Sequence, residues 1–173
     1  LRELPETPAQ QVRQDLLALP AIPERPVTLE LPVQQEPLVL PVILVLGGSQ
    51  GAVRLNEALL TGLKKLVERY VIIHQAGKNN IAETVATADA VLFDSPHKNR
   101  YKVFDYLGPL ALRMAAGAAS VVVSRAGSTI FEIAAWGVPS IIIPISERIS
   151  SDQRSNAFAY ARGNACVVVE EDN

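Results

Sequence analysis

One strand-to-helix turn constrains the fold of this 173-residue chain more than any other feature. Residues 42–46 are all apolar, which is typical of a strand buried on both faces. Gly47, Gly48 and Gly51 follow and allow close approach of the backbone, and residues 52–60 then carry apolar side chains at helical spacing. The free amides and the positive dipole end of that helix would face the turn, so an anion is its natural ligand. The alternative is a tight turn without a ligand.

Strand and helix patterns alternate from residue 38 onward. The strands we expect span residues 39–46, 70–74, 101–104, 120–123, 140–143 and 165–169, and the helices 52–68, 109–118, 128–136 and 152–162. Residues 79–98 have no clear pattern. Alternation of this kind, with unbroken apolar strands, predicts an α/β, Rossmann-like parallel sheet with helices on both faces. Ligands of such sheets bind beyond the carboxyl ends of the strands.

The composition changes sharply before the first expected strand. Eight of the twelve prolines fall within residues 1–41, and all ten glycines come at or after Gly47. We therefore expect residues 1–37 to be a proline-rich segment or linker, with a short helix after Thr7-Pro8, and residues 38–173 to be the domain. The chain begins with Leu1 rather than methionine, so we expect a piece of a longer protein whose domain is incomplete at the carboxyl end.

Charge and composition exclude several classes of protein. The net charge of −2 offers no basic surface for nucleic acid, and no apolar run reaches the length of about 20 residues that spans a bilayer. Two histidines and one cysteine without ligand spacing argue against a metal site. We expect Cys166 to be a buried strand residue in a reducing compartment, His74 a packed, hydrogen-bonded residue at a sheet edge, and His97 part of a surface turn.

Three polar loops, at 47–51, 124–132 and 144–156, leave the carboxyl ends of expected strands and should converge on one cleft. Glu132 could accept hydrogen bonds from the two hydroxyls of a ribose, or it could form a capping box with Thr129. Gln153 and Asn156 are three residues apart at a helix start and could read sugar hydroxyls on one face. Gln153 could instead form a capping box with Ser150.

The combined motifs are more specific than each alone. They are Gly47-Gly48-Ser49-Gln50-Gly51-Ala52 with Asn56, Ser124-Arg125-Ala126-Gly127 with Thr129 and Glu132-Ile133-Ala134-Ala135, Pro139 to Pro144, and Asp152-Gln153 with Asn156-Ala157. In this order they resemble the carboxyl-terminal half of the MurG family. Members of that family are bacterial glycosyltransferases that move N-acetylglucosamine from UDP to a lipid-linked muramyl pentapeptide (lipid I to lipid II) in peptidoglycan synthesis. The resemblance covers about residues 38–171.

The resemblance implies a UDP-N-acetylglucosamine-binding domain, one half of a GT-B glycosyltransferase, in which UDP-N-acetylglucosamine is the donor substrate and no cofactor is needed. The implied substrate-binding residues are Gly48, Ser49, Gln50, Gly51, Leu107, Arg125, Gly127, Ser128, Thr129, Glu132, Asp152, Gln153 and Asn156. Among them, the glycine turn and Thr129 would contact phosphate, Leu107 or a neighbour would offer backbone to uracil, and Gln153 with Asn156 would read the sugar.

The resemblance also implies partners and a location. The lipid-linked acceptor and the catalytic base would be handled by an amino-terminal domain, whose glycine-rich loop ending in histidine has no match here, so this chain alone should not catalyse transfer. The enzyme would work at the cytoplasmic face of the bacterial plasma membrane. The loop from Arg125 to Glu132 is one residue shorter than the family pattern.

Two other functions fit parts of the pattern. A nicotinamide-dependent oxidoreductase would carry Gly-x-Gly-x-x-Gly and an acidic residue at the end of the second strand, where this chain has His74-Gln75. A nucleotide-sugar-binding module without catalytic activity would share the motifs and differ only in lacking an acceptor domain.

Overall fold

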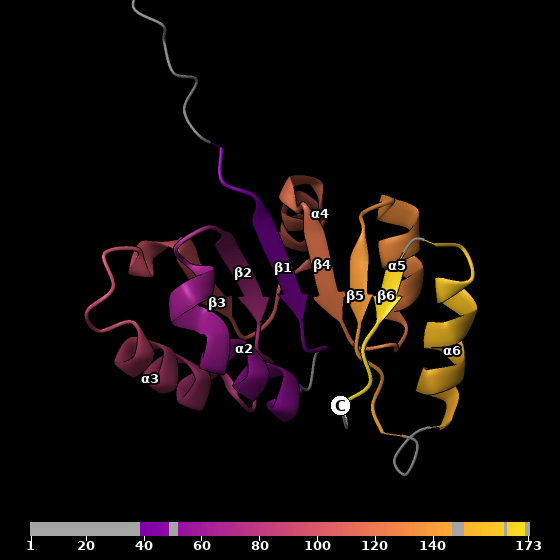
Figure 1. Cartoon of the computed structure of the whole chain (residues 1–173), viewed down its shortest axis with the longest axis horizontal. Helices are drawn as coiled ribbons and strands as arrows, with labels where there is room; N and C mark the ends of the chain where they lie inside the picture. The colour runs from indigo at the N-terminus through magenta and orange to yellow at the C-terminus, as the bar shows by residue number, and fades with distance from the viewer. Residues whose placement is uncertain (1–38, 49–51, 147–150, 165, 172–173) are drawn as a thin grey trace, which may run out of the picture. The chain divides into compact units, whose positions relative to one another are not determined.

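The computed structural model describes residues 39–48, 52–146, 151–164 and 166–171. Six strands within these residues form one parallel sheet in the order β3-β2-β1-β4-β5-β6 (Figure 1). They are β1 (Val42–Leu46), β2 (Val71–Gln75), β3 (Tyr101–Phe104), β4 (Val121–Ser124), β5 (Ser140–Ile142) and β6 (Cys166–Val168). The strand order reverses at β1, which pairs with both β2 and β4. Ligand crevices of open α/β sheets lie at such a reversal, at the carboxyl ends of the strands.

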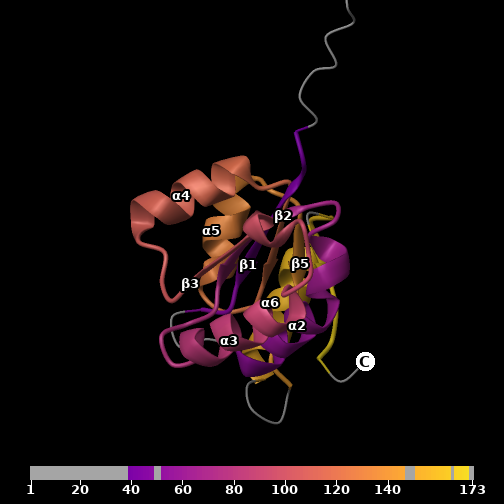
Figure 2. The ribbon, with the colours of Figure 1, turned by 90° about the vertical axis from the view of Figure 1, so that its left-hand side faces the viewer.

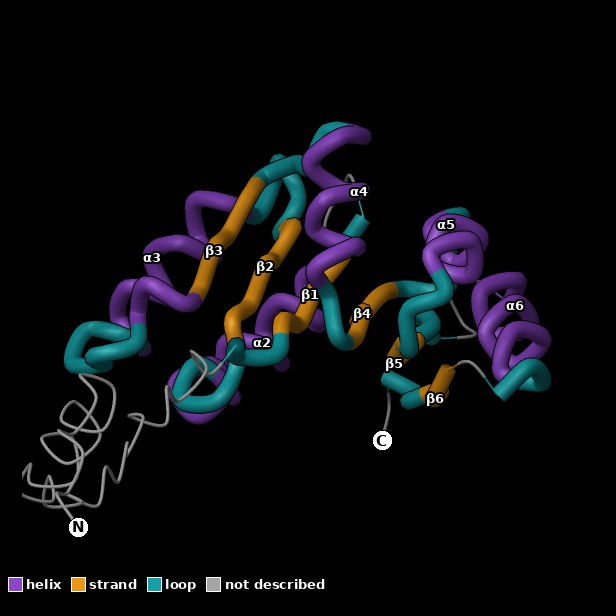
Figure 3. The backbone as a smooth tube through the Cα atoms, turned by 90° about the horizontal axis from the view of Figure 1, so that it is seen from above, coloured by secondary structure: helices purple, strands orange, loops and turns teal. Residues whose placement is uncertain are grey.

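Helices cover both faces of the sheet. Their bounds are α2 (Val53–Leu66), α3 (Ile81–Val91), α4 (Pro109–Ala118), α5 (Thr129–Trp136) and α6 (Ser151–Ala161), with a short 3-10 turn, η1 (Lys98–Arg100), before β3. The first two pack on one face and the last three on the other. Figure 2 shows α2 and α5 on opposite sides of the strands, and Figure 3 shows α4, α5 and α6 in succession along one side.

The core consists of two layers separated by the sheet. Val45 of β1 packs with Leu63 and Ile72 in one layer, and Leu44 packs with Ile133 in the other. Neighbouring residues of a strand point to opposite faces, so a strand covered on both sides must be apolar at each position. The unbroken apolar runs of the sequence therefore reflect the two layers, and the predicted fold class is confirmed.

Most predicted elements are found, with ends that differ by a few residues. The exception is α3, since residues 79–98 were expected to lack a clear pattern and contain a helix of 11 residues. Its buried residues are Thr84 and Ala88, which are too small and too polar to give an apolar stripe. Residues 1–37 lie outside the described residues, so their predicted helix and the domain boundary stay predictions.

Two predictions about individual side chains were wrong in part. His74 is packed and hydrogen-bonded as expected, but β2 is an interior strand between β1 and β3 rather than an edge. Cys166 lies in a strand as expected but is only half-buried, because β6 has a neighbour on one side alone. Burial still raises the pKa of the Cys166 thiol.

β1 and α2 come very close together at Gly47. The Gly47 N–H donates to the Gln75 carbonyl at 3.1 Å. A Cβ placed on Gly47 would lie 3.1 Å from the Ala52 nitrogen and 3.2 Å from the Gln75 oxygen, both of them backbone atoms. Gly48 follows with a φ of +81°, a conformation that glycine adopts at little cost. The turn thus requires glycine at both positions, while residues 49–51 lie outside the described part of the chain.

A buried chain of hydrogen bonds connects α2 to β2 and β3. Asn56 donates from Nδ2 to the Ala76 carbonyl at 3.1 Å, and its Oδ1 lies 3.0 Å from His74 Nε2. His74 Nδ1 lies 2.8 Å from the Tyr101 hydroxyl. Because Asn56 Oδ1 can only accept, Nε2 carries the imidazole proton and Nδ1 accepts from Tyr101. This chain of hydrogen bonds fixes the position of α2 relative to the sheet, and with it the position of the glycine turn.

This arrangement requires a neutral imidazole. Burial lowers the pKa of His74 from 6.5 to about 4, because the charged form would lose its water. Protonation would also place a second donor against the Tyr101 hydroxyl, which would have to turn away from Nδ1. The hydrogen-bond network is thus intact at neutral pH, and acid destabilises it by favouring the charged imidazole.

We predict that Gly47→Ala lowers the free energy of unfolding by about 1–3 kcal/mol, because the new methyl group meets two backbone atoms that cannot retreat. The matched control is Gly62→Ala within α2, where the added Cβ would meet only the end of the Leu66 side chain at 3.7 Å. That control should be neutral or stabilising by up to about 1 kcal/mol. Urea unfolding of both variants measures the difference, and equal stabilities would contradict the account.

We predict that acidification lowers the free energy of unfolding because it favours protonation of His74. Its pKa is depressed on folding, so its contribution is complete above pH 6.5 and is lost as the pH falls toward about 4. The loss should reach about 3 kcal/mol, as about 1.4 kcal/mol corresponds to each pKa unit. His74→Gln should flatten this part of the profile in chemical unfolding measured from pH 7 to pH 4, whereas His97→Gln should keep it. A wild-type slope in His74→Gln would contradict the assignment.

Candidate functional site: a cavity at the carboxyl edge of the sheet

Segments from the ends of all six strands meet at one cavity. It encloses about 640 Å³, a volume typical of ligand pockets. The lining residues are Gly47, Gly48, Ala52, Val53, Arg54, Gln75, Tyr106, Leu107, Leu112, Ser124, Arg125, Gly127, Ser128, Thr129, Glu132, Ile145, Gln153 and Glu171. The strand arrowheads in Figure 1 point toward this edge. The described parts of the three loops predicted to converge therefore do so, at the place where the strand order reverses.

Two helices begin at this cavity, and the residue at the cap position of each makes no side-chain cap. Ala52 precedes α2 and Ser128 precedes α5, and neither position carries a side-chain hydrogen bond to the helix start. The first turn of α2 also lacks an acidic residue. The positive dipole ends of both helices therefore face an anion in the cavity. At the start of α5 the Ile130 and Phe131 amides already donate to the carbonyls of Gly127 and Ser128, at 3.2 and 3.1 Å.

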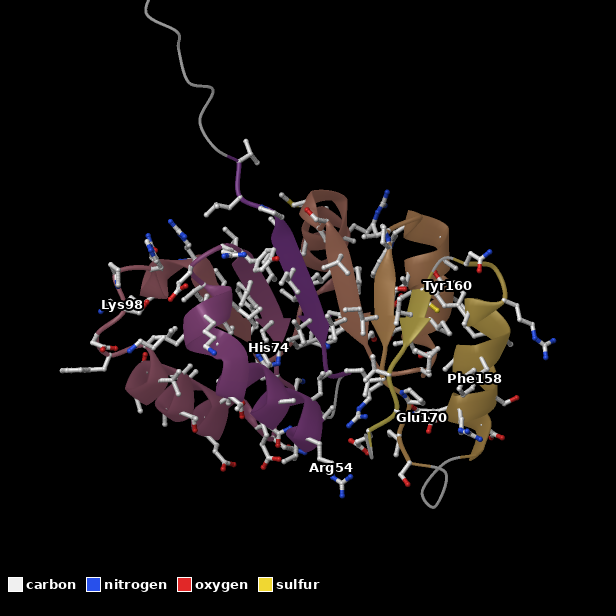
Figure 4. The ribbon with its side chains drawn as sticks, in the orientation of Figure 1. Arg54, His74, Lys98, Phe158, Tyr160 and Glu170 are labelled. Carbon is white, nitrogen blue, oxygen red and sulfur yellow. The ribbon has the colours of Figure 1, made fainter. Side chains whose placement is uncertain are left out.

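Charged side chains gather at the same place. Arg125 follows β4, and its guanidinium donates to the carbonyls of Ile143 and Pro144 at 3.3 and 3.4 Å and pairs with Glu171. Glu171 also lies 3.5 Å from a guanidinium nitrogen of Arg54, which projects from the first turn of α2. Figure 4 shows Arg54 at the end of the helix nearest the carboxyl edge. Arg125 thus joins β4 to the end of β5 and keeps positive charge in the cavity.

Glu132 lies in the first turn of α5, is exposed and lines the cavity. The capping box with Thr129 that the sequence allowed is not formed, because α5 begins at Thr129 and its cap position, Ser128, makes no side-chain cap. The Glu132 carboxylate is therefore not used in a capping box at the start of α5. It can accept hydrogen bonds from a ligand.

The two amides predicted to share one face of α6 diverge. Gln153 lines the cavity, and its Oε1 accepts from the Ile145 N–H at 3.4 Å. Asn156 is exposed and lines a different recess, beside Phe131 and Tyr160. Asp152 is exposed and is not among the residues that line the main cavity. The cap partner proposed for Gln153, Ser150, lies outside the described residues.

The loop after β3 forms the wall next to β2. Tyr106 donates its N–H to the Asp105 carboxylate at 2.7 Å, and Leu107 donates its N–H to Gln75 Oε1 at 2.9 Å. Gln75 therefore joins the end of β2 to this loop. These two amides are engaged, so the backbone at Tyr106 and Leu107 offers a ligand its carbonyl groups rather than its N–H groups.

The structure brings most of the predicted binding residues together. Those that line the cavity are Gly48, Leu107, Arg125, Gly127, Ser128, Thr129, Glu132 and Gln153. Ser49, Gln50 and Gly51 lie outside the described residues. Sequence reasoning missed Arg54, Gln75, Tyr106 and Glu171. Gln75 and Tyr106 could have been found from their places at the ends of expected strands, whereas nothing near Glu171 in the sequence indicates its distant ion pairs.

A second cavity, of about 280 Å³, lies between α2 and α3. Glu57 and Glu83 line it, which makes it a poor place for an anion. Within the described ranges, no cluster of three histidine, cysteine or acidic residues could hold a metal ion. No helix in that part of the chain is both long and apolar enough to cross a membrane.

Comparisons with known proteins agree with this architecture. The sequence model of the glycosyltransferase family 28 C-terminal domain matches residues 42–173. A UDP-N-acetylglucosamine–N-acetylmuramyl-(pentapeptide) pyrophosphoryl-undecaprenol N-acetylglucosamine transferase from Treponema denticola is 36% identical over 137 residues, which are 77% of this chain and 35% of the relative. A protein of the same name from Proteus mirabilis is 36% identical over 163 residues, 94% of this chain and 42% of the relative.

Solved structures show the same fold. The crystal structure of Acinetobacter baumannii MurG matches with a TM-score of 0.65 and 30% identity over 78% of this chain and 39% of that one. The C-terminal CMP-Kdo binding domain of WaaA from the same species has a TM-score of 0.52 at 15% identity, over 76% of this chain and 74% of that domain, and supports the fold alone.

The chain spans between 35% and 42% of the length of the two relatives described above. Its Rossmann-like sheet and its match to part of the MurG structure confirm the prediction of one half of a GT-B glycosyltransferase. The family's sequence model runs from the first residue of β1 to the end of the chain. This chain therefore belongs to the family of glycosyltransferase family 28 C-terminal domains.

Proposed function

We propose that this chain binds UDP-N-acetylglucosamine as the sugar-donor domain of an inverting transferase of peptidoglycan synthesis. The observation that carries the proposal is the cavity at the carboxyl edge. It combines the Gly47–Gly48 turn, two arginines and a carboxylate at the start of α5. The names of the relatives, which contain both the sugar nucleotide and the lipid-linked acceptor, support this choice of reaction.

The diphosphate would lie between the helix starts. The amino ends of α2 and α5 face the cavity, and Arg54 and Arg125 add two positive charges. When the acceptor hydroxyl displaces UDP from the anomeric carbon, negative charge grows on the departing diphosphate. Amide dipoles and guanidinium groups held in place before the reaction stabilise that charge without reorganising.

The nucleoside would lie along the β3 wall. Uracil carries one ring N–H donor, and the backbone around Leu107 meets it with carbonyl groups because the Tyr106 and Leu107 amides are already engaged. Glu132 would accept hydrogen bonds from the two ribose hydroxyls. An NAD-binding domain would instead place a carboxylate at the end of β2, where Gln75 is bound to Leu107.

The sugar would be read by Gln153. Its Oε1 is held by the Ile145 N–H, which leaves both amide hydrogens to donate to sugar hydroxyls or to an acetyl carbonyl. Asn156, which faces another recess, is not part of this proposal. Amide hydrogens recognise acceptor atoms without adding a charge, which suits an uncharged sugar.

The acceptor would bind elsewhere in the full-length protein. A second domain, outside this chain, would hold the lipid-linked muramyl pentapeptide and the base that activates its hydroxyl, at the cytoplasmic face of a bacterial plasma membrane. The reaction would use no cofactor and no protein-bound metal, because arginines and helix ends hold the leaving group. We therefore expect this chain alone to bind the sugar nucleotide without transferring the sugar.

Calorimetric titration of the chain with UDP-N-acetylglucosamine, UDP-glucose and NAD tests the proposal. UDP-N-acetylglucosamine should bind most tightly, UDP-glucose less tightly and NAD least. Glu132→Ala should weaken binding of both uridine nucleotides by about ten- to hundredfold, since hydrogen bonds to a charged group contribute about 1.5–3 kcal/mol.

The matched control is Glu83→Ala, which removes a carboxylate from the first turn of α3 away from the main cavity. Its affinities should equal those of the wild-type chain. Equal affinities for Glu132→Ala and wild type would disprove the role of Glu132. A folded chain that binds none of the uridine nucleotides would disprove the proposed function.

A further inference from the structure

Glu171 places a carboxylate inside the cavity, between two arginines. It pairs with the Arg125 guanidinium and lies 3.5 Å from Arg54 Nη1. The Glu171 and Arg125 side chains are 8% and 12% exposed, whereas Arg54 is 63% exposed. The pair with Arg125 is therefore shielded from water, and salt weakens it little. Glu171 thus binds the guanidinium groups to which an anion in this cavity would bind.

Arg125 is not fully satisfied by this pairing. Its Nη1 donates to two backbone carbonyls and its Nη2 to Glu171, but the buried Nε has no hydrogen-bond partner among the residues that the structure describes. Buried donors without a partner are uncommon in native proteins. An acceptor with more oxygen atoms than one carboxylate, such as a diphosphate, could satisfy the guanidinium more completely.

A diphosphate and an ionised Glu171 cannot share this position without strong repulsion. Both would lie between the same two guanidinium groups, at the end of α2 and beside the Gly47–Gly48 turn. The carboxylate must therefore move when the diphosphate arrives. The diphosphate has the greater charge and the larger number of acceptor atoms, so it can replace Glu171 at both arginines.

The chain around Glu171 permits this movement. The last sheet hydrogen bond after β6 is donated by Val169 to the Ile142 carbonyl at 3.0 Å, two residues before Glu171. The intervening Glu170 pairs with Arg154 on α6, and both of these side chains are about 40% exposed. Glu170, labelled in Figure 4, therefore marks the surface end of a segment whose next residue enters the cavity.

We propose that Glu171 is an affinity-determining residue that occupies the diphosphate position of the ligand-free chain and is displaced by the sugar nucleotide. This inference rests on the proposed function and adds a competing group within the same site. It has a consequence for ligand choice. A ligand with a diphosphate competes with Glu171, whereas uridine alone leaves the carboxylate in place.

The test compares wild type, Glu171→Gln and Glu170→Gln by calorimetric titration with UDP and with uridine. Glutamine keeps the shape of Glu171 and an acceptor oxygen for Arg125, so the fold should be retained, and thermal unfolding checks that it is. Glu171→Gln should bind UDP about three- to thirtyfold more tightly than wild type, because one competing charge is removed. Its affinity for uridine should not change.

Glu170→Gln is the matched control, since it removes the same charge from the neighbouring surface position. Its affinity for UDP should stay within about twofold of wild type. UDP binding by Glu171→Gln that is unchanged or weaker would overturn the inference and leave the proposed function in place. An equal gain for uridine, or an equal gain in Glu170→Gln, would also overturn it. Absence of uridine and UDP binding in all three chains would remove both proposals.

Discussion

The close approach of β1 to α2 at Gly47 is the constraint on which the cavity depends. The backbone of β1 approaches the start of α2 and the end of β2 at once, and a Cβ on Gly47 would lie only 3.1 and 3.2 Å from their backbone atoms. The Asn56–His74–Tyr101 chain of hydrogen bonds holds α2 at the corresponding height. The same contacts that stabilise the fold therefore place the amino end of α2 at the cavity.

Charge is distributed to suit an anion at one edge of a chain that is slightly acidic as a whole. The net charge is −2, and the cavity between α2 and α3 carries two carboxylates. The cavity at the carboxyl edge also carries two carboxylates, Glu132 and Glu171, but there Arg54 and Arg125 and the positive ends of two helices accompany them. Glu171 balances part of this positive charge while the cavity is without a ligand, which limits the cost of bringing the arginines together.

Structural features that depend on local sequence patterns were predicted. Features that depend on contacts between residues distant in the sequence were missed. Unbroken apolar strands follow from a sheet covered on both faces, and the Gly47–Gly48 turn follows from the close approach of β1 to α2, so the positions of both were predicted. Helix α3 was missed because its buried face is formed by Thr84 and Ala88. Asn156 was placed in the site from its spacing with Gln153, and the structure shows it lining another recess, so its role in binding stays a prediction. Glu171 is 46 residues from Arg125, and no local pattern reports such a pair.

The central claim is that the cavity at the carboxyl edge binds the sugar nucleotide. The most direct measurement is a titration of the ¹⁵N-labelled chain with UDP-N-acetylglucosamine, followed by backbone amide chemical shifts. We predict that the largest changes occur at Gly48, Gly127 and Thr129, around the two helix starts. Changes centred on Glu57 and Thr87, in the cavity between α2 and α3, with these three amides unaffected, would contradict it.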